Sequence, residues 1–387
     1  MNEKTLGLLG NRTPQDFIAQ YWQKEPLLVR AALPSVAGVI DGNDLAGIAC
    51  EANGEARLII TDAGEKNWQC EQGPFKAKRF KTLPASHWTL LVQSVDHWIP
   101  EIADLLQHFS FLPRWRLDDI MISYATDGGG VGPHFDYYDV FLLQASGTRR
   151  WKTGQRCDEH SPLRDHPQMK LLQKFDTKTD DTLQTGDMLY IPAGVAHWGT
   201  AMGDDCITIS IGFRAASHRD LIQYAMETIA ETLPSHQRYR DSTASIDSDP
   251  FCINDSAVSN VKAIWDSIDT AIIHSALAEA LGVQATESRY PERLADELLP
   301  DEEMQALAAI ILADPSTVAH SPTSRFAYRK RDEEQAELFV DGEKFGTDLK
   351  LAQAICHCQL TKNLLKKTAC KQLVFKLVQQ GNLIVAD

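Results

Sequence analysis

Residues 131–141 read VGPHFDYYDVF and place a histidine and a carboxylate, His134 and Asp136, two positions apart. Alternate side chains of a β-strand point to the same face of a sheet, so these two are expected to share a face while Phe135 points the other way. Imidazole and carboxylate groups are common metal ligands. The H-x-D pattern occurs often by chance, however, so a metal site also requires a third ligand.

A candidate third ligand lies in the stretch GDMLYIPAGVAHWGTA, residues 186–201. A Gly-Asp turn precedes a predicted strand there, a Pro-Ala-Gly bend follows it, and His197 comes next. Two histidines and one carboxylate form the facial triad of non-haem Fe(II) oxygenases, which leaves metal positions open for a cosubstrate and dioxygen. Singly, His134 could be a core histidine, Asp136 a turn cap and His197 an aromatic neighbour of Trp198. Their joint order favours a metal site, although zinc or manganese in a cupin would use similar ligands.

Short predicted strands occupy the middle of the chain and are separated by Gly and Pro clusters. They cover residues 57–61, 89–95, 119–124, 134–143, 149–153, 187–191 and 206–213. Many short strands of this kind are typical of a barrel or a jelly roll, which can bring distant strands side by side. The pattern therefore predicts a fold in which His197 can approach His134.

The pattern changes to helical spacing near Ser217. Helices are predicted around residues 221–233 and 261–272, with a polar linker, residues 235–250, between them. Such amphipathic helices either pair two copies of the chain or pack on the barrel of their own chain.

A third pattern begins at residue 324. A hairpin is predicted at Asp341-Gly342, helical runs cover 349–358 and 360–369, and 375–380 and 383–385 close the chain. This order resembles a winged helix, for which a contact with protein or a structural role is favoured over DNA binding. The predicted fold class is multidomain α+β, with a jelly roll over 1–216, a helical domain over 217–313 and a winged-helix-like domain over 314–387.

The composition limits the possible functions. The chain has 387 residues, too many for one ordinary core, and a formal net charge of -15. That charge argues against direct nucleic-acid binding and suits a basic protein partner, or simply solubility. The eight cysteines form no C-x-x-C pair, which predicts reduced thiols in a reducing compartment. No membrane-length apolar run and no signal sequence is recognised, so a cytoplasmic protein is expected.

The chain resembles the JmjC-domain oxygenases that depend on Fe(II) and 2-oxoglutarate, and among them the bacterial ribosomal oxygenases. The stretches that carry the resemblance are FIAQYWQKEPLLVRAALP, LDDIMISYATDGGGVGPHFDYYDVFLLQASGTRRW, GDMLYIPAGVAHWGTA and ISIGFRA. The resemblance implies a JmjC double-stranded β-helix, a helical dimerisation domain and a C-terminal winged helix. It also implies hydroxylation of an arginine Cβ in the sixteenth protein of the large ribosomal subunit, with release of succinate and carbon dioxide. His134, Asp136 and His197 would bind Fe(II), with 2-oxoglutarate and O2 as cosubstrates.

The far carboxylate of 2-oxoglutarate needs a buried cation, and a guanidinium can bond both of its oxygens. Arg149, Arg150 and Lys152 are the candidates. Strand alternation places Arg149 and Arg150 on opposite faces but does not say which one points inward. The resemblance places 2-oxoglutarate on Arg149, with Ser123 as a matching hydroxyl on an earlier strand.

Candidate substrate-binding residues follow from the same strand alternation. Asp119, Met121 and Ser123 share a face, so Asp119 and Met121 would line the cavity nearer its mouth. Asp119 would hold a substrate guanidinium, with Tyr138 stacked beside it. The alternative is that Asp119 pairs with Arg116 or with a structural cation.

Three other functions compete with arginine hydroxylation. The first is a JmjC hydroxylase of another residue or protein, for example a ribosomal histidine. The second is a non-redox metal cupin, and the third is a binding protein with a degenerate metal site. The complete triad argues against the third, and an arginine placed for a dicarboxylate argues against the second. The expected partners are a basic ribosomal protein and a second copy of the chain, without a membrane.

Overall fold

The computed structural model of the protein describes residues 5–62, 67–289 and 300–385. The first four residues of the expected signal-free N-terminus, and residues 290–299 of the expected helical domain, lie outside the described residues. The chain divides into two compact units, residues 1–215 and 216–387. In the described parts of the chain, no helix has the length and apolarity needed to cross a membrane.

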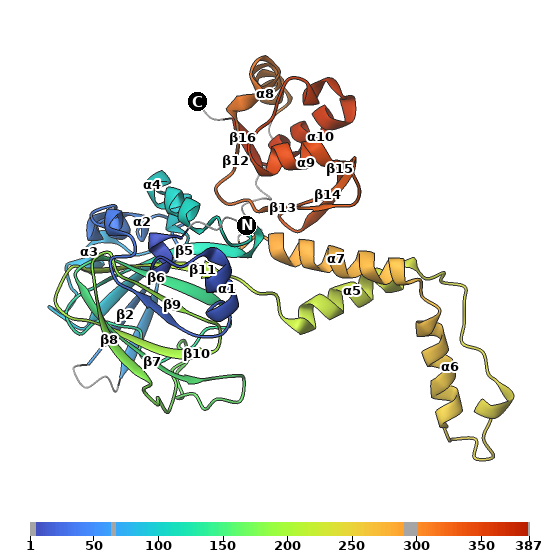
Figure 1. Cartoon of the computed structure of the whole chain (residues 1–387), viewed down its shortest axis with the longest axis horizontal. Helices are drawn as coiled ribbons and strands as arrows, with labels where there is room; N and C mark the ends of the chain where they lie inside the picture. Colours follow the sequence, from blue (N-terminus) through green and yellow to red (C-terminus); the bar gives the residue numbers. More distant parts are fainter. Residues whose placement is uncertain (1–4, 63–66, 290–299, 386–387) are drawn as a thin grey trace. The chain divides into compact units, whose positions relative to one another are not determined.

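The first unit is built on two antiparallel sheets (Figure 1). The larger sheet has the order β1 (Leu27–Val29), β9 (Met188–Ile191), β6 (Asp139–Ser146), β11 (Cys206–Phe213), β5 (Leu117–Ala125), β4 (Trp88–Val92), β2 (Ala56–Thr61) and β3 (Trp68–Gln72). The smaller sheet has the order β10 (Val195–Ala201), β7 (Thr148–Arg156) and β8 (Thr179–Gln184). This is the antiparallel, cupin-like architecture that the strand pattern predicted.

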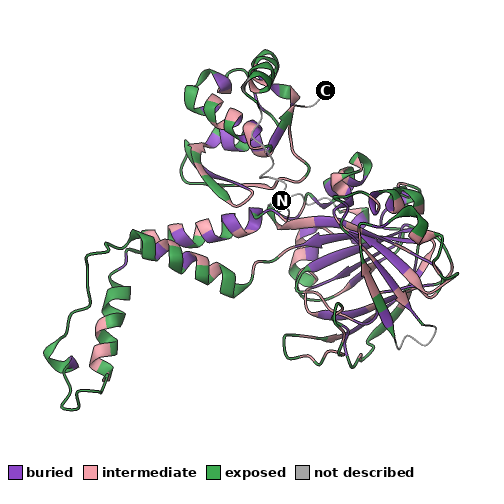
Figure 2. Ribbon diagram, turned by 180° about the vertical axis from the view of Figure 1, so that it is seen from behind, coloured by how far each residue is buried: buried purple, intermediate pink, exposed green. Residues whose placement is uncertain are grey.

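Helices cover one face of the larger sheet. They are α1 (Pro14–Gln20), α2 (Gly42–Ile48), α3 (Ala77–Phe80) and α4 (Pro100–Asp104), with 3₁₀ turns η1 (Gly7–Leu9), η2 (Pro34–Val36), η3 (Val95–His97), η4 (Leu105–Phe109) and η5 (Arg114–Arg116). Phe17 of α1 packs on Phe141 and Tyr190 of the sheet. Alternation along β6 then sends Val140 and Leu142 to the opposite face, where they pack on the smaller sheet. The strands of the larger sheet are accordingly mostly buried (Figure 2).

Several predicted elements need correction. The strand predicted over 134–143 begins only at Asp139, because residues 131–138 form an irregular segment with one isolated bridge at His134. Strands β3, β8 and β10 were not predicted. The sequence of β8, TDDTLQ, is polar because this strand lies at the edge of the smaller sheet and is largely exposed.

The second unit contains helices, a three-stranded sheet and a two-stranded sheet. Its helices are α5 (His218–Thr232), α6 (Asp255–Asp266), α7 (Thr270–Thr286), α8 (Asp301–Ala313), α9 (Leu349–Cys356) and α10 (Thr368–Gln379), with 3₁₀ turns η6 (Thr243–Ser245), η8 (Pro315–Thr317) and η9 (Leu364–Lys366). Strands β13 (Phe326–Lys330), β14 (Gln335–Val340) and β15 (Glu343–Asp348) form one sheet, and β12 (Val318–His320) pairs with β16 (Leu383–Val385).

Two helix predictions in this unit were wrong. The apolar repeat over 261–272 is not one helix, because the chain breaks at Ser267 between α6 and α7. Within the run over 360–369, residues 364–366 form the short turn η9, and helix α10 begins only at Thr368. The predicted hairpin at Asp341-Gly342 is present between β14 and β15. The winged-helix class of residues 314–387 stays a prediction.

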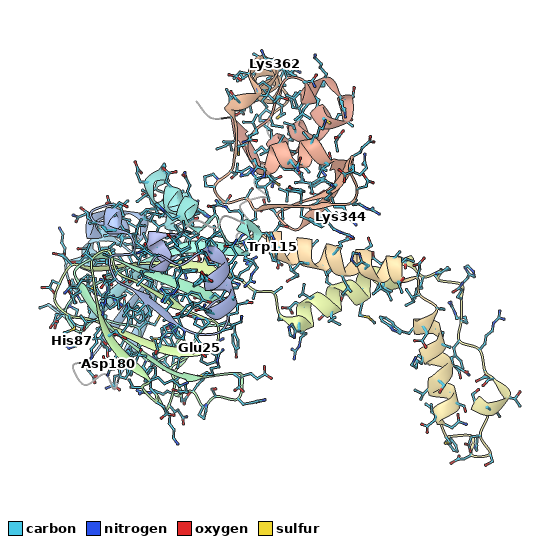
Figure 3. The ribbon with its side chains drawn as sticks, viewed as in Figure 1. Glu25, His87, Trp115, Asp180, Lys344 and Lys362 are labelled. Atoms are coloured by element: carbon cyan, nitrogen blue, oxygen red, sulfur yellow. The ribbon has the colours of Figure 1, made fainter. Side chains whose placement is uncertain are left out.

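Helix α7 packs directly on β14. A Cβ atom at Gly282 would lie 2.5 Å from ring atoms of Phe339, so the absence of a side chain there lets the ring lie against the helix. An ion pair between Lys344 (labelled in Figure 3) and Glu279 adds to this contact. These contacts join the helical region to the three-stranded sheet within the second unit.

Candidate active site

The structure brings His134 and His197 together through their backbones. The His134 N–H donates to the His197 carbonyl at 3.1 Å, and the His197 N–H donates to the His134 carbonyl at 2.8 Å. These two bonds form an isolated antiparallel bridge between the irregular segment and β10. The two imidazole centroids are consequently 4.2 Å apart.

Asp136 completes the cluster from the same irregular segment. Its carbonyl accepts the Gly194 N–H at 2.7 Å, which joins the segment to the turn before β10. Its Oδ2 lies 3.9 Å from His134 Nε2 and 3.5 Å from His197 Nε2. Ligand atoms of the three residues lie within 4.8 Å of one another. His134 and Asp136 thus approach a common point without lying on a regular strand. The expectation that strand alternation places both side chains on one face of a sheet was therefore wrong.

Both histidines are oriented to present Nε2 to this point. His134 Nδ1 lies 3.0 Å from the Gly132 carbonyl, and His197 Nδ1 lies 3.0 Å from the Val195 carbonyl. A carbonyl only accepts, so we infer that each Nδ1 carries the proton and each Nε2 has a free lone pair. Burial, reinforced by the neighbouring His134, lowers the pKa of His197 to about 4 despite the nearby Asp136. The ring is therefore neutral near pH 7, as metal binding requires.

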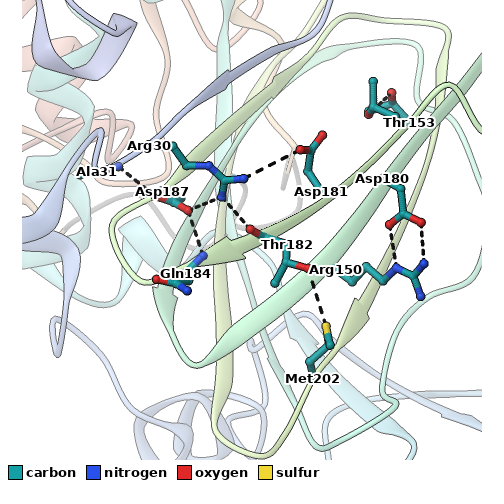
Figure 4. Close-up of polar contacts among 11 residues, drawn as sticks. Arg30, Ala31, Arg150, Thr153, Asp180, Asp181, Thr182, Gln184, Asp187 and Met202 are labelled. Atoms are coloured by element: carbon teal, nitrogen blue, oxygen red, sulfur yellow. Dashed lines mark hydrogen bonds and ion pairs between the residues drawn. The ribbon is translucent and has the colours of Figure 1, made fainter.

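Arg149 and Arg150 separate as strand alternation requires. Arg150 forms two hydrogen bonds, of 2.7 and 2.5 Å, with the carboxylate of Asp180 on β8 (Figure 4). Arg149 is only 3% exposed, and its Nε and Nη2 have no hydrogen-bond partner among the described residues. Leaving two buried guanidinium N–H groups unpaired is costly. These groups fit the two oxygens of a carboxylate.

The other expected site residues lie along β5 and in the irregular segment. Ser123 is buried, and its hydroxyl makes a long 3.5 Å contact with the Thr208 carbonyl. Met121 is partly buried in an apolar cluster that includes Trp68. The alternation along β5 is as expected, because Ile120 and Ile122 join the core on the opposite face.

Asp119 and Tyr138 are electrostatically coupled. Oδ2 of Asp119 accepts the Ser94 N–H at 3.0 Å. Tyr138 is 37% exposed. Burial of its hydroxyl, together with Asp136, Asp119 and a further carboxylate, raises the pKa of Tyr138. The phenol therefore lies within electrostatic range of both the metal cluster and Asp119.

Trp151 is a site residue that the sequence reasoning missed. Its ring centroid lies 5.8 Å from the Arg149 guanidinium carbon and 6.0 Å from the His197 ring, so the indole connects the two candidate sites. Its Nε1 is buried and has no partner among the described residues. Gly199 makes room for the indole, since a Cβ there would lie 2.7 Å from Trp151 Cη2. The spacing of two residues from Arg149 was the available signal.

Comparisons with known proteins agree with this geometry. Residues 104–221 match the model of the JmjC domain. A probable ribosomal oxygenase of Haemophilus influenzae is 32% identical over 341 residues, which are 86% of this chain and 81% of that protein. The chain belongs to the JmjC-domain ribosomal oxygenase family. The resemblance stated from the sequence is confirmed.

Further matches come from Escherichia coli. The ribosomal protein uL16 3-hydroxylase is 40% identical over 209 residues, or 54% of each chain. The crystal structure of YcfD superposes with a TM-score of 0.80 at 27% identity, covering 96% of this chain and 97% of that one. YcfD, a ribosomal oxygenase, has also been solved with cobalt and 2-oxoglutarate, with a TM-score of 0.77 at 26% identity and the same coverage.

Proposed function

We propose that the chain hydroxylates the Cβ of an arginine in ribosomal protein uL16, using Fe(II), 2-oxoglutarate and O2 and releasing succinate and carbon dioxide. The observation that carries this proposal is the buried Arg149, whose Nε and Nη2 have no hydrogen-bond partner in the part of the chain that the structure describes, in the same β-fold as the cluster of His134, Asp136 and His197. The name of the E. coli relative supports uL16 as the substrate. Because ribosomes are assembled in the cytoplasm, the reaction would take place there.

The metal would be held by Nε2 of His134, Nε2 of His197 and a carboxylate oxygen of Asp136. When bound, Fe(II) supplies the redox chemistry that couples the oxidative decarboxylation of 2-oxoglutarate to hydroxylation of a carbon. The hydrogen bonds from Nδ1 to the Gly132 and Val195 carbonyls fix both imidazoles and raise their basicity as ligands. The charge of Asp136 offsets part of the metal charge.

The cosubstrate would be positioned by groups deeper in the fold. Arg149 Nε and Nη2 would bind the far carboxylate of 2-oxoglutarate, with the Ser123 hydroxyl as a further donor. Trp151 lies between Arg149 and His197, so its indole would exclude water from the space between the carboxylate and the metal. The protein thereby orients the keto acid and limits uncoupled turnover.

The substrate side chain would enter past Tyr138. Asp119 would hold the substrate guanidinium at the mouth of the cavity, Tyr138 would stack beside it and Met121 would contact its apolar stem. The electrostatic coupling of Tyr138 to Asp119 and Asp136 supports a shared space for these groups. The net charge of -15 suits a basic ribosomal protein.

The test is a reaction of the full chain with Fe(II), 2-oxoglutarate and purified uL16. We expect succinate, together with one added oxygen atom on a uL16 arginine in fragment mass spectra, and neither product with His197→Ala. Oxygen on a histidine or on another ribosomal protein would favour the first competing function. An absence of succinate under all conditions would overturn the proposal in favour of a non-redox cupin or a binding protein.

We also propose that the helical region forms a homodimer. None of the residues of α6, all of which the structure describes, is buried, and Figure 2 shows this helix as largely exposed. Its apolar side chains Val258, Val261, Ile264 and Trp265 are 42–56% exposed and lie at helical spacing. A helix with an uncovered apolar stripe of this size requires a partner surface, and a second copy supplies the same stripe.

Sedimentation equilibrium tests the dimer. The chain should sediment at twice its mass of 43.1 kDa, and Val261→Asp should shift it to the single mass. Ser259→Asp, which adds the same charge at a polar position of the same helix, is the control and should leave the dimer intact. A wild-type chain that sediments as a monomer at micromolar concentration would contradict the dimer.

A further inference from the structure

A buried carboxylate close to the metal cluster has no role in the function proposed above. Asp139, the first residue of β6, has no exposed surface and follows Asp136 by three positions. Its carboxylate accepts the Tyr190 hydroxyl at 2.7 Å and contacts Gln23 Nε2 and Arg116 Nη2, each at 3.4 Å. The backbone N–H of Ala193 also lies close enough to favour the charged form of this carboxylate.

The nearby Ala193 amide is informative because of its place in the chain. Ala193 belongs to the turn between β9 and β10, and β10 carries His197. The next residue of that turn, Gly194, donates its N–H to the Asp136 carbonyl at 2.7 Å. The segment that carries Asp136 thus meets the turn before His197 at two successive residues, through the hydrogen bond from Gly194 to a backbone carbonyl and through the Asp139 carboxylate beside the Ala193 amide.

The groups around Asp139 are themselves fixed. Tyr190 is fully buried, and its oxygen accepts the Gln23 N–H at 2.8 Å. Arg116 donates from Nε to the Arg214 carbonyl at 2.6 Å, and its guanidinium carbon lies 5.6 Å from the centroid of the Trp22 ring. A carboxylate held by three hydrogen-bond partners from separate parts of the chain has one position. It can therefore hold in place both the irregular segment that carries Asp136 and the turn that precedes His197.

We propose that Asp139 is a positioning residue of the metal centre: its carboxylate sets the separation of Asp136 and His197, and so the metal affinity, without touching the metal. The inference rests on the proposed metal-binding role of that cluster. Outer partners that orient metal ligands commonly change metal affinity about 10–100-fold when they are removed. A purely structural carboxylate would instead change stability and leave the affinity of the folded protein unchanged.

The test compares two buried aspartates of the same unit by Co(II) titration and by thermal unfolding without metal, in the full chain. Asp139→Asn keeps the shape of the side chain and removes its charge, and should weaken Co(II) binding about 10–100-fold. Asp187→Asn is the matched control, because Asp187 is also buried but bonds Arg30, Ala31 and Gln184 at the other end of β9. It should lower the thermal midpoint while leaving the Co(II) affinity unchanged within about twofold of wild type.

A second variant keeps the proposal testable if Asp139→Asn does not fold. Tyr190→Phe removes one oxygen atom and one bond to Asp139, and should weaken Co(II) binding in the same direction by a smaller factor. Wild-type Co(II) affinity in a folded Asp139→Asn or Tyr190→Phe variant would overturn the positioning role. Failure of the wild-type chain itself to bind Co(II) through His134, Asp136 and His197 would instead overturn the proposed function.

Discussion

Arg149 and Arg150 are adjacent in the chain and point to opposite faces of β7: Arg149 lies inside the fold, where its Nε and Nη2 have no hydrogen-bond partner among the described residues, and Arg150 points outward onto Asp180. Of the two guanidinium groups, only that of Arg149 is already shielded from solvent before a ligand binds. An exposed pair such as Arg150–Asp180 contributes at most about 1 kcal/mol. We therefore expect Arg149 to contribute far more to ligand binding than Arg150.

The first prediction compares these two arginines. Leaving a buried carboxylate of 2-oxoglutarate unpaired costs about 3–5 kcal/mol, so Arg149→Ala should lower 2-oxoglutarate affinity about 10²–10⁴-fold. Arg150→Ala, the matched control, should leave the affinity unchanged. Calorimetric titration of each metal-loaded variant measures both values, and a larger loss with Arg150→Ala would mean that the strand faces are assigned the wrong way round.

The second prediction concerns the three candidate ligands. A metal at 100 times its Kd stabilises the folded protein by about 2.7 kcal/mol, which raises the unfolding midpoint of a unit of this size by about 5–10 °C. His134→Ala, Asp136→Ala and His197→Ala should each remove this increase in a thermal scan with Co(II). A variant whose midpoint still rises as in wild type would exclude that residue as a ligand.

The third prediction uses Gly199 on β10, which is paired with Trp151 on the neighbouring strand β7. A methyl group at this position would lie within 2.7–2.9 Å of three indole atoms, so Gly199→Ala must displace the indole or the strand. We expect a loss of about 1–3 kcal/mol in the free energy of unfolding, measured by urea titration, together with weaker binding of 2-oxoglutarate.

The control for Gly199→Ala is Gly47→Ala in α2, where no atom lies within 4 Å of the new Cβ. Alanine favours a helix by about 1 kcal/mol over glycine, so this variant should be as stable as wild type or more stable. Equal effects of the two substitutions would show that the indole is not tightly held by the strand beside it.

The fourth prediction is a pH dependence of stability. Partial burial alone would raise the pKa of the Asp187 carboxyl, but the N–H groups of Gln184 and Ala31 and the Arg30 guanidinium together hold the pKa below its usual value of 3.8. As the pH falls below about 5, the unfolded chain takes up the proton first, and acid therefore favours unfolding. The stabilising contribution is complete at neutral pH and is lost as the pH falls through the lowered native pKa.

Asp187→Asn should remove this contribution. We expect the variant to be about 1–3 kcal/mol less stable at pH 7 and to show a shallower decrease in the free energy of unfolding between about pH 5 and pH 3. Urea titrations at several pH values measure both quantities. Parallel pH profiles for wild type and variant would contradict the assignment.

The sequence predicted which residues the structure gathers around one point but not the way in which they meet. His134, Asp136 and His197 stood out because their residue types and order are those of a facial triad. Their approach, however, depends on a bridge between residues 134 and 197 and on the bond from Gly194 to Asp136, and such long-range pairings leave no local pattern. A regular strand was assumed where the chain is irregular.

The arginine choice shows the same limit. Alternation correctly separated Arg149 from Arg150. Which of the two side chains points into the fold, however, is fixed only by the pairing of β7 with β8 and β10. Trp151 was missed because an aromatic residue on a strand usually means core packing. Its place between Arg149 and His197 becomes visible only when β7 and β10 are side by side.

The fold was predicted best where periodicity is strong. Strand β11, residues 206–213, was predicted with the observed bounds. The break between α6 and α7 was missed because Val261, Ile264, Trp265 and Ile268 continue one apolar repeat past Ser267. The apolar residues of α6 are exposed rather than buried in their own chain. Regular apolar spacing alone therefore did not establish that residues 261–272 form one continuous helix.

The most direct test of the account is a crystal structure of the full chain with Co(II) and 2-oxoglutarate. We expect an anomalous peak about 2.0–2.2 Å from Nε2 of both histidines and from a carboxylate oxygen of Asp136, with the far carboxylate of 2-oxoglutarate on the Arg149 guanidinium. A metal bound elsewhere, or a 2-oxoglutarate carboxylate that leaves Arg149 unpaired, would contradict it.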